Sequence, residues 1–447
     1  MSINKMNKVR EIRIDPSIFI SPPYKKCPKC GKDSFGVLSI FKSHYTRRCK
    51  ECFYPRGDQK PEIFYLPVLQ KKIIYLDQFA ISNMMKILNP NTKAYSKQKD
   101  KFWLNLFERI YRLFCMQIIV CPYSEFHTDE SLVTPYYESL KRMYELLSYG
   151  VRFESQLRIE VIQLLDYANK WLSGKDKENV DATLDTNLAI QGEINQWLDR
   201  FIISVPDFKE NWVDQLREDR DRGHKGFISA FIQWQTETHF TFDDWYKREY
   251  TAYGQSVIDR YFQYLRTQID QQNKEVQISF ETLFPPPAVL TFRAIKHFFL
   301  DKGLSENKAI EKTIEFLKSP SLENVPFVRI YALLAAALAR KAAAGQKNPP
   351  NQGTANDITA ISFVLPYCDA IFIDNECAAL LKEKPLSERI NYGTKIFSLN
   401  NKNEFIDYLD SLEKNISPVQ VHFLNEVYGD SWKKSFNSIY QELQGDN

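Results

Sequence analysis

The pattern of apolar positions predicts strands alternating with helices in two separated parts of the chain. Apolar runs without polar alternation occur at 71–77 (KKIIYLD), 116–120 and 370–373, a pattern typical of strands buried on both faces. Residues 394–398 (TKIFS) form a further predicted strand. Apolar residues at helical spacing lie between or after these runs, at 80–86, 100–114, 358–365 and 403–412. Strands that alternate with helices predict a parallel sheet.

A long helical segment separates the two parts. Residues 134–345 carry helical spacing almost throughout, with predicted helices at 137–147, 157–172, 194–201, 256–272 and 327–344. Because predicted strands flank this segment on both sides, the two parts must meet in space to form one sheet. We therefore expect an α/β domain that carries a large all-helical insertion.

The stretch 356–374 (NDITAISFVLPYCDAIFID) holds two acids at informative positions. Asn356 is a predicted helix cap and Asp357 falls in the first turn, where the helix dipole favours a carboxylate. Pro366 stops the helix near residue 365, and Asp374 ends the following strand. The helix and the strand are both about 13 Å long, so Asp357 and Asp374 should lie at the same edge of the sheet.

A third acid, Asp77, ends the first predicted strand. Ligands of open α/β sheets bind beyond the carboxyl ends of the strands, and clustered carboxylates repel one another unless a cation joins them. Oxygen ligands suit Mg²⁺ or Mn²⁺. Each acid also has a structural explanation, since Asp357 would complement the helix dipole while Asp77 and Asp374 would cap helices. Their coincidence at one edge favours a metal site.

Cysteine spacing predicts a second metal site near the N-terminus. Two CxxC pairs separated by 18 residues form the usual four-thiolate zinc pattern, with Cys27, Cys30, Cys49 and Cys52 as ligands. Disulfides and unligated thiols are the alternatives. His44 is interpreted as exposed, because four cysteines already complete a tetrahedron. The other cysteines lie among apolar residues and are interpreted as core side chains: Cys115, Cys121, Cys368 and Cys377.

The expected zinc ribbon is basic and aromatic. Residues 25–56 contain only two acids but nine basic residues. These are Lys25, Lys26, Lys29, Lys32, Lys42, Arg47, Arg48, Lys50 and Arg56. Aromatic residues lie between them. This combination favours nucleic-acid contact, while a solvated surface on a docking module is the alternative.

The overall composition is ordinary for a soluble protein and does not by itself indicate a binding partner. The chain has 447 residues, 44% of them hydrophobic, and a net charge of +3, which is too small to predict a nucleic-acid partner by itself. No run approaches 18 apolar residues, and the N-terminus is polar, so we expect no membrane partner and a cytoplasmic protein.

The segments IIYLD, VCPYSEFHTDE, NDITAISFVLPYCDAIFID and TKIFSLNNKNEFIDYL together resemble the PIN-like nuclease domain. The resemblance implies a Rossmann-like parallel sheet with an acidic cluster that binds one or two Mg²⁺ or Mn²⁺ ions. Matched residue by residue, the implied catalytic and metal-binding acids are Asp77, Glu130, Asp357 and Asp374. The insertion departs from a minimal domain of this kind.

Some residues near these motifs have open interpretations. Glu125 is the alternative to Glu130, since it lies nearer the start of the same predicted helix. Asp369 precedes its strand, which places it about 16 Å from Asp374, so we interpret it as structural. Helix capping or surface hydrogen bonding is the favoured interpretation of Ser82, Ser124 and His127, with substrate or water contact as the alternative.

The resemblance implies a metal-dependent nuclease that hydrolyses phosphodiester bonds by metal-activated water without a covalent protein intermediate. RNA is the favoured substrate over DNA, with the basic ribbon holding the strand and the insertion as a surface for a protein activator or regulator. A catalytically silent PIN-like scaffold and a zinc-ribbon adaptor are the alternatives. The expected organisation is a lead-in (1–23), zinc ribbon (24–57), first half-domain (71–133), helical insertion (134–345), second half-domain (350–412) and C-terminal helical appendage (413–447).

Overall fold

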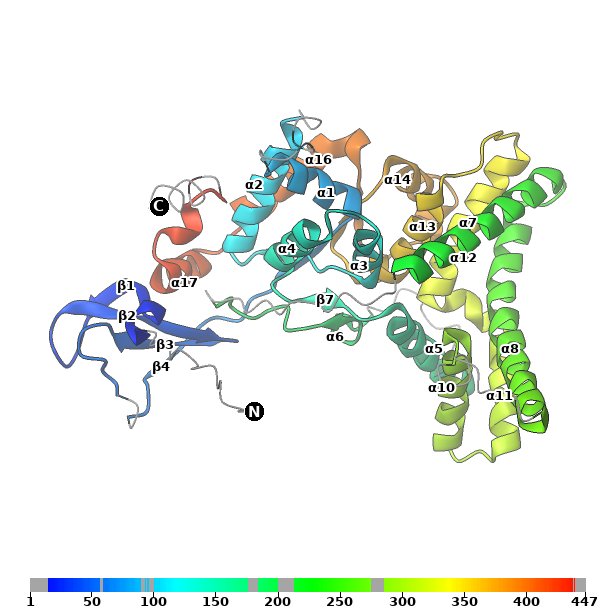
Figure 1. The fold of residues 1–447 in the computed structure, drawn as a ribbon, viewed down its shortest axis with the longest axis horizontal. Coiled ribbons are helices and arrows are strands. Elements are labelled where there is room, and N and C mark those ends of the chain that lie inside the picture. The colour runs from blue at the N-terminus through cyan, green and yellow to red at the C-terminus, as the bar shows by residue number, and fades with distance from the viewer. Residues whose placement is uncertain are drawn as a thin grey trace, which may run out of the picture.

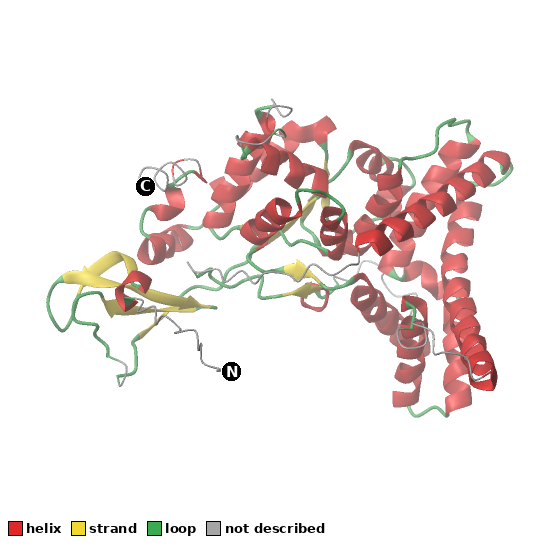
Figure 2. Cartoon of the chain, in the orientation of Figure 1, coloured by secondary structure: helices red, strands yellow, loops and turns green. Residues whose placement is uncertain are grey.

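The computed structural model describes residues 15–56, 59–89, 93, 95, 100–175, 184–199, 213–274, 285–436 and 438. This part of the chain is mixed α/β, with an N-terminal antiparallel sheet, a parallel sheet and a large helical region (Figures 1 and 2). None of the described helices combines the length and the apolar character needed to cross a membrane.

Within the described residues, ten strands form three sheets. The antiparallel sheet contains β1 (Ser21–Lys26), β2 (Asp33–Phe41), β3 (His44–Cys49) and β4 (Ile63–Tyr65). The parallel sheet contains β5 (Lys72–Leu76), β6 (Ile119–Val120), β9 (Ala370–Phe372) and β10 (Lys395–Phe397). A small antiparallel pair joins β7 (Arg152–Phe153) and β8 (Ile190–Gln191).

The helices around the parallel sheet come from both halves of the chain. They are α1 (Gln78–Ile87), α2 (Phe102–Cys115), α3 (Glu125–Leu132), α4 (Tyr137–Ser148), α13 (Gln352–Val364), α14 (Asn375–Lys382), α15 (Leu386–Arg389), α16 (Lys402–Lys414) and α17 (Pro418–Tyr428). The helices between the halves are α5 (Gln156–Leu172), α6 (Thr186–Ala189), α7 (Val213–Thr236), α8 (Phe242–Lys274), α10 (Pro287–Asp301), α11 (Glu306–Leu317) and α12 (Pro326–Ala343).

The parallel sheet has the order β10-β9-β5-β6. The chain passes from β5 outward to β6, and after the helical segment it returns to β9 on the other side of β5. The strand order therefore reverses between β5 and β9. In open α/β sheets this switch point, at the carboxyl ends of the strands, is the usual place for a ligand.

Both faces of the sheet are covered, as the unbroken apolar runs predict. Along β5, Ile74 and Leu76 face a core shared with α1, α2, α4 and α16. Ile73 and Tyr75 face the opposite core, which α13 and α14 share with α5, α12 and other helices of the insertion. Alternate residues of a strand point to opposite faces, so one short strand contributes to two cores.

Within the insertion, α12 is the central helix. It is rich in alanine and leucine, and most of its residues are buried. The helices α7, α8 and α13 all pack on it. A helix that is apolar on all sides must be covered on all sides, and this requirement joins the insertion to the second half of the sheet domain.

Several sequence-based element boundaries are wrong. The predicted strand 116–120 is shortened to β6, because Met116 and Gln117 make a turn in which Gln117 has φ 60°. The predicted helix 194–201 does not form over residues 194–199, and its last two residues lie outside the described chain. The predicted all-helical segment also contains the pair β7–β8. The predicted lead-in falls largely outside the described residues.

Candidate metal centre at the carboxyl edge of the parallel sheet

Asp77 and Asp374 end neighbouring strands at the switch point. The register pairs Leu76 with Phe372, and the backbone N–H of Asp77 donates to the carbonyl of Phe372 at 2.9 Å. Both acids then cap the helix that follows. Asp77 accepts from the backbone N–H of Phe79 at 3.2 Å, and Asp374 Oδ1 accepts from the N–H groups of Glu376 and Cys377 at 2.7 and 3.0 Å.

Asp357 reaches the same edge by a different route from the predicted one. The helix α13 begins at Gln352, not at Asn356, because the Asn351 side chain caps it by accepting from the N–H of Thr354 at 3.1 Å. Asp357 therefore lies in the second turn and not in the first. Its place beside Asp77 and Asp374 comes from the packing of α13 and owes little to the helix dipole.

The structure separates the two candidate glutamates on α3. Glu125 is exposed, and its Oε2 accepts from the backbone N–H of Gln156 at 3.0 Å. Glu130 is half-buried and close enough to Asp77 for its charge to raise the pKa of that carboxyl. When the oxygen and nitrogen of the Gln78 side-chain amide are exchanged so that both make hydrogen bonds, the amide nitrogen donates to Glu130 Oε2 at 2.7 Å. Glu130 thus belongs to the acidic edge and Glu125 does not.

The acids at this edge strongly disfavour simultaneous ionisation. Burial, followed by the charge of Glu130, raises the pKa of Asp77 to about 7. Burial, followed by the charges of Asp77 and Asp374, raises the pKa of Asp357 to about 9. Such neighbours favour protonated forms until a cation compensates for their charge.

Asp374 shows the clearest unmet requirement. Its Oδ1 accepts two backbone hydrogen bonds, whereas its Oδ2 is buried and has no hydrogen-bond partner within the described chain. A buried, unpaired carboxylate oxygen is costly. Ligand atoms of Asp357, Asp374 and Cys377 lie within 4.8 Å of one another, so a cation placed among them would satisfy this oxygen.

Two neighbours of these acids were not predicted from the sequence. Cys377, interpreted as a core side chain, is buried in the apolar core and also lies against Asp374 and Asp357. Burial and the charges of these acids raise the pKa of its thiol, so the thiol keeps its proton. Glu376 adds to the charge acting on Asp357. Both follow Asp374 within one helical turn, and this spacing was the signal that could have identified them.

Asp369 and His127, which were interpreted as structural, make hydrogen bonds to the backbone of neighbouring elements. Asp369 lies at the opposite edge, where its carboxylate accepts from the N–H of Ile73 and from Lys72 Nζ, both at 2.8 Å. His127 is buried, with Nδ1 accepting from the N–H of Ser124 at 3.0 Å and Nε2 donating to the Leu76 carbonyl at 2.8 Å. Burial lowers the pKa of His127 to about 4. This neutral imidazole ties the start of α3 to the end of β5.

The four N-terminal cysteines form the second candidate metal site. Their sulfurs lie within 4.8 Å of one another, and the Cys27–Cys52 and Cys30–Cys49 separations are both 3.7 Å. A tetrahedral zinc with Zn–S bonds of about 2.3 Å has S–S edges of about 3.8 Å, whereas a disulfide requires about 2.05 Å. The group therefore has the shape of a four-thiolate zinc site.

Backbone and hydroxyl donors surround this group. The N–H of Lys29 points to Cys27 Sγ at 3.4 Å and that of Cys52 to Cys49 Sγ at 3.3 Å, and Ser34 Oγ lies 3.0 Å from Cys49 Sγ. Such donors stabilise thiolates. His44 lies in β3 and is half-buried, outside the cysteine group.

The positive charge of the ribbon is smaller at its surface than the sequence predicts. Arg47 is only 1% exposed, and its guanidinium donates to the carbonyls of Pro23, Phe35 and Glu426 at 2.7–3.0 Å. Arg47 is therefore an interior residue, which corrects its inclusion among surface cations. Ion pairs also occupy other cations of the ribbon, joining Lys25 to Glu426, Lys32 to Glu51 and Lys42 to Glu193.

The chain matches no protein-family model, no curated protein and no solved structure in comparisons with known proteins.

Proposed function

We propose that the protein is a divalent-metal-dependent nuclease that hydrolyses phosphodiester bonds, with RNA favoured over DNA. The observation that carries the proposal is the meeting of Asp77, Glu130, Asp357 and Asp374 at the switch point of a parallel sheet, together with the unpaired Oδ2 of Asp374. The resemblance of the surrounding motifs to PIN-like nucleases supports the same activity.

The donor set fits Mg²⁺ or Mn²⁺. Carboxylate oxygens are the ligands that these hard cations prefer. Asp357 and Asp374 would hold the ion directly, because their oxygens are among those that lie within 4.8 Å of one another. Asp77 and Glu130 would act directly or through water. When bound, a cation supplies charge stabilisation to a phosphodiester and lowers the pKa of the attacking water.

The chain's own groups would keep this centre in position. Backbone N–H groups at the starts of α1 and α14 hold Asp77 and Asp374 from one side. The Cys377 thiol lies against Asp374 and Asp357 and would stay protonated there, because burial and the charges of these acids raise its pKa. Structural Zn²⁺ at Cys27, Cys30, Cys49 and Cys52 completes the proposed metal content.

Cleavage of labelled single-stranded RNA and DNA with Mn²⁺ or Mg²⁺ tests the proposal. We expect cutting that Asp374→Asn and the double variant Asp77→Asn/Asp374→Asn reduce at least a hundredfold, because the cation loses its ligands. The two glutamates of α3 provide a matched pair, in which Glu130→Gln should lower activity and Glu125→Gln should not.

Calorimetric titration with Mn²⁺ separates the alternatives. Absence of both cutting and Mn²⁺ binding would overturn the nuclease proposal and favour the scaffold. Mn²⁺ binding that Asp374→Asn leaves unchanged would place the ion elsewhere.

A further inference from the structure

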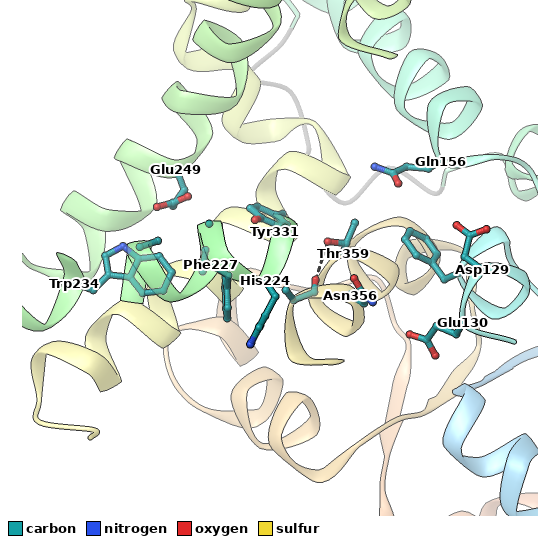
Figure 3. A pocket seen from close by; sticks show the side chains of 16 residues that line it. Asp129, Glu130, Gln156, His224, Phe227, Trp234, Glu249, Tyr331, Asn356 and Thr359 are labelled. Atoms are coloured by element: carbon teal, nitrogen blue, oxygen red, sulfur yellow. Dashed lines mark hydrogen bonds between the residues drawn. The ribbon is translucent and has the colours of Figure 1, made fainter. Parts of the chain in front are cut away.

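A pocket with a cavity volume of about 540 Å³ lies between the insertion and the sheet domain (Figure 3). Its walls come from α3, α7, α8, α12 and α13, together with the start of α5. The volume falls in the range of small-ligand sites, roughly 300–1,000 Å³. Of the four proposed metal-binding acids, Glu130 alone lines this pocket. The metal centre therefore does not account for most of the space.

The pocket is continuous with the acidic edge. Glu130 lines it, as does Asn356, the residue that precedes Asp357 on α13. Figure 3 shows Asp129 and Glu130 at one end of the pocket and Trp234 with Glu249 at the other. A molecule lying along the pocket would therefore have one end beside the proposed metal and the other end between helices of the insertion.

The part of the pocket formed by α7 and α12 offers aromatic surfaces. Phe227 and Trp234 from α7 and Tyr331 from α12 line it. Aromatic side chains stack on nucleobases, and each stacked base contributes substantially to the binding of single-stranded nucleic acid. The faces offered here are broad and planar, which suits a base better than a sugar or a phosphate.

Polar groups in the same region lack partners. His224 Nδ1 is buried and makes no hydrogen bond within the described chain. Glu249 is half-buried, and its carboxylate has no hydrogen bond to any described residue. Burial raises the pKa of this carboxyl. Unpaired polar groups that face a cavity are expected where a ligand supplies the missing hydrogen bonds.

From this geometry we propose that the pocket holds one unstacked nucleobase bearing an exocyclic amino group, from the nucleotide next to the cleaved phosphate. The inference rests on the proposed nuclease function. Phe227, Trp234 and Tyr331 stack on or flank the base. The carboxylate of Glu249 accepts a hydrogen bond from the amino group, and His224 supplies the second polar contact. Uracil is disfavoured, because it has no exocyclic amino group and the two carbonyl oxygens that flank its single N3–H repel a carboxylate.

Removing single bases from the substrate, one position at a time, tests this proposal. A set of RNAs, each with one abasic nucleotide at a different position around the cleavage site, is cut by the full-length protein with Mn²⁺. We expect one position at which the abasic nucleotide lowers kcat/KM by about tenfold to a hundredfold. Replacing guanine, adenine or cytosine with uracil at that position should also lower the rate.

Two variants connect the effect to the pocket. Tyr331→Ala and Glu249→Gln should slow cleavage of the intact RNA but leave the rate on the abasic RNA equal to that of the wild type. Glu249→Gln should also lose the discrimination against uracil. Tyr136→Ala and Glu311→Gln are matched controls at exposed positions outside the pocket. A purely structural defect would instead slow both substrates equally.

The outcomes distinguish the two proposals. Metal-dependent cleavage without any sensitive position, or equal losses on intact and abasic RNA, would overturn the base pocket while leaving the nuclease intact. If the protein cuts no nucleic acid, calorimetry with guanosine, adenosine, cytidine and uridine monophosphates still tests the pocket. Binding that Tyr331→Ala and Glu249→Gln weaken would support it, and no binding would refute it.

Discussion

Asp374 divides its two carboxylate oxygens between two tasks. Oδ1 accepts the N–H groups that begin α14, while Oδ2 is buried at the acidic edge without a hydrogen bond in the described chain. A residue that only capped a helix would gain nothing from burying its second oxygen there. The arrangement is better explained by a cation that binds Oδ2 together with Asp357.

The raised pKa values at this edge predict a metal-free protein that loses stability as the pH rises. The native pKa values of Asp77 and Asp357 are about 7 and about 9, above the unfolded value near 3.9. Between these limits the native state holds protons that the unfolded chain has released, so unfolding is favoured as the pH increases. The loss begins near pH 4 and is complete above about pH 9.

Asp357→Asn should remove the larger part of this loss. Without metal at pH 8.5 we expect the variant to be more stable than the wild type by about 1–3 kcal/mol, because the amide needs no proton to become neutral. Thermal melts between pH 5 and 9 measure the difference, with Asp301→Asn as the exposed control. Mn²⁺ should reverse the order by stabilising the wild type alone. Parallel pH profiles for the wild type and Asp357→Asn would contradict this account.

At the scale of elements, local sequence signals predicted which strands form and which acids follow them. They predicted less well where each element begins and ends. Unbroken apolar runs identified β5 and β9, and an acid after each run identified two residues of the candidate site. These signals are local, since they depend on burial of both strand faces and on capping. The start of α13 was missed because Asn351 and Asn356 are equivalent as caps in the sequence. In the structure it is Asn351 whose side chain accepts from the N–H of Thr354 and begins the helix.

The candidate base pocket could not be predicted from the sequence. Its walls come from helices separated by more than a hundred residues, and no periodicity records which of their faces meet. Glu130 was distinguished from Glu125 only by the resemblance, because both lie on the same short helix. The structure separates them through long-range neighbours, Gln156 for Glu125 and Asp77 for Glu130.

A close helix crossing in the insertion gives a prediction at this scale. A Cβ added at Gly254 of α8 would lie 1.9 Å from the backbone oxygen of Leu317 and 2.7 Å from Leu322 Cδ1. Gly254→Ala must therefore push α8 away from the end of α11, at an expected cost of at least about 2 kcal/mol. Hydrogen exchange should become faster in α8 and α11.

Two glycines of α7 are suitable controls for Gly254. A Cβ at Gly223 or Gly226 would meet nothing within 4 Å. Because alanine favours helices over glycine, each substitution to Ala should leave stability unchanged or raise it by about 0.5–1 kcal/mol. Unchanged exchange in Gly254→Ala would show that the crossing is not tightly packed.

At the scale of the whole molecule, strands β1–β4 lie at the left of Figure 1, and α3, α13 and α14, which carry or follow three of the acids, lie beyond α2 and α4 from them. The ribbon contacts residues beside the start of β5, where Trp197 N–H donates to the Lys42 carbonyl and Asn195 accepts from the Lys71 N–H. The acids follow the ends of the same strands. A nucleic acid held at both places would have to extend along the molecule, so the ribbon would act on long substrates and not on the cleavage step.

Arg47 is a buried polar link between the antiparallel sheet of the ribbon and the C-terminal helix α17. Its guanidinium joins the carbonyls of Pro23 and Phe35 in the ribbon to that of Glu426 in α17. Arg47→Ala would leave these buried acceptors unpaired, which should cost roughly 3–5 kcal/mol. We expect faster hydrogen exchange in α17 and easier proteolysis between the ribbon and β5. Lys50→Ala, at an exposed position of the ribbon, should change neither.

The same variant tests whether the two candidate metal sites are independent. Because the cysteine group is closed by its own loops and the acidic edge by β5, β9 and α13, Arg47→Ala should keep both its zinc and its Mn²⁺ affinity. Cleavage of short RNA should then persist while long RNA is bound more weakly, by about tenfold if the ribbon holds the strand. Equal binding of long RNA by the wild type and Arg47→Ala would remove the ribbon from substrate recognition. Loss of Mn²⁺ binding would instead show that α17 supports the acidic edge through the sheet.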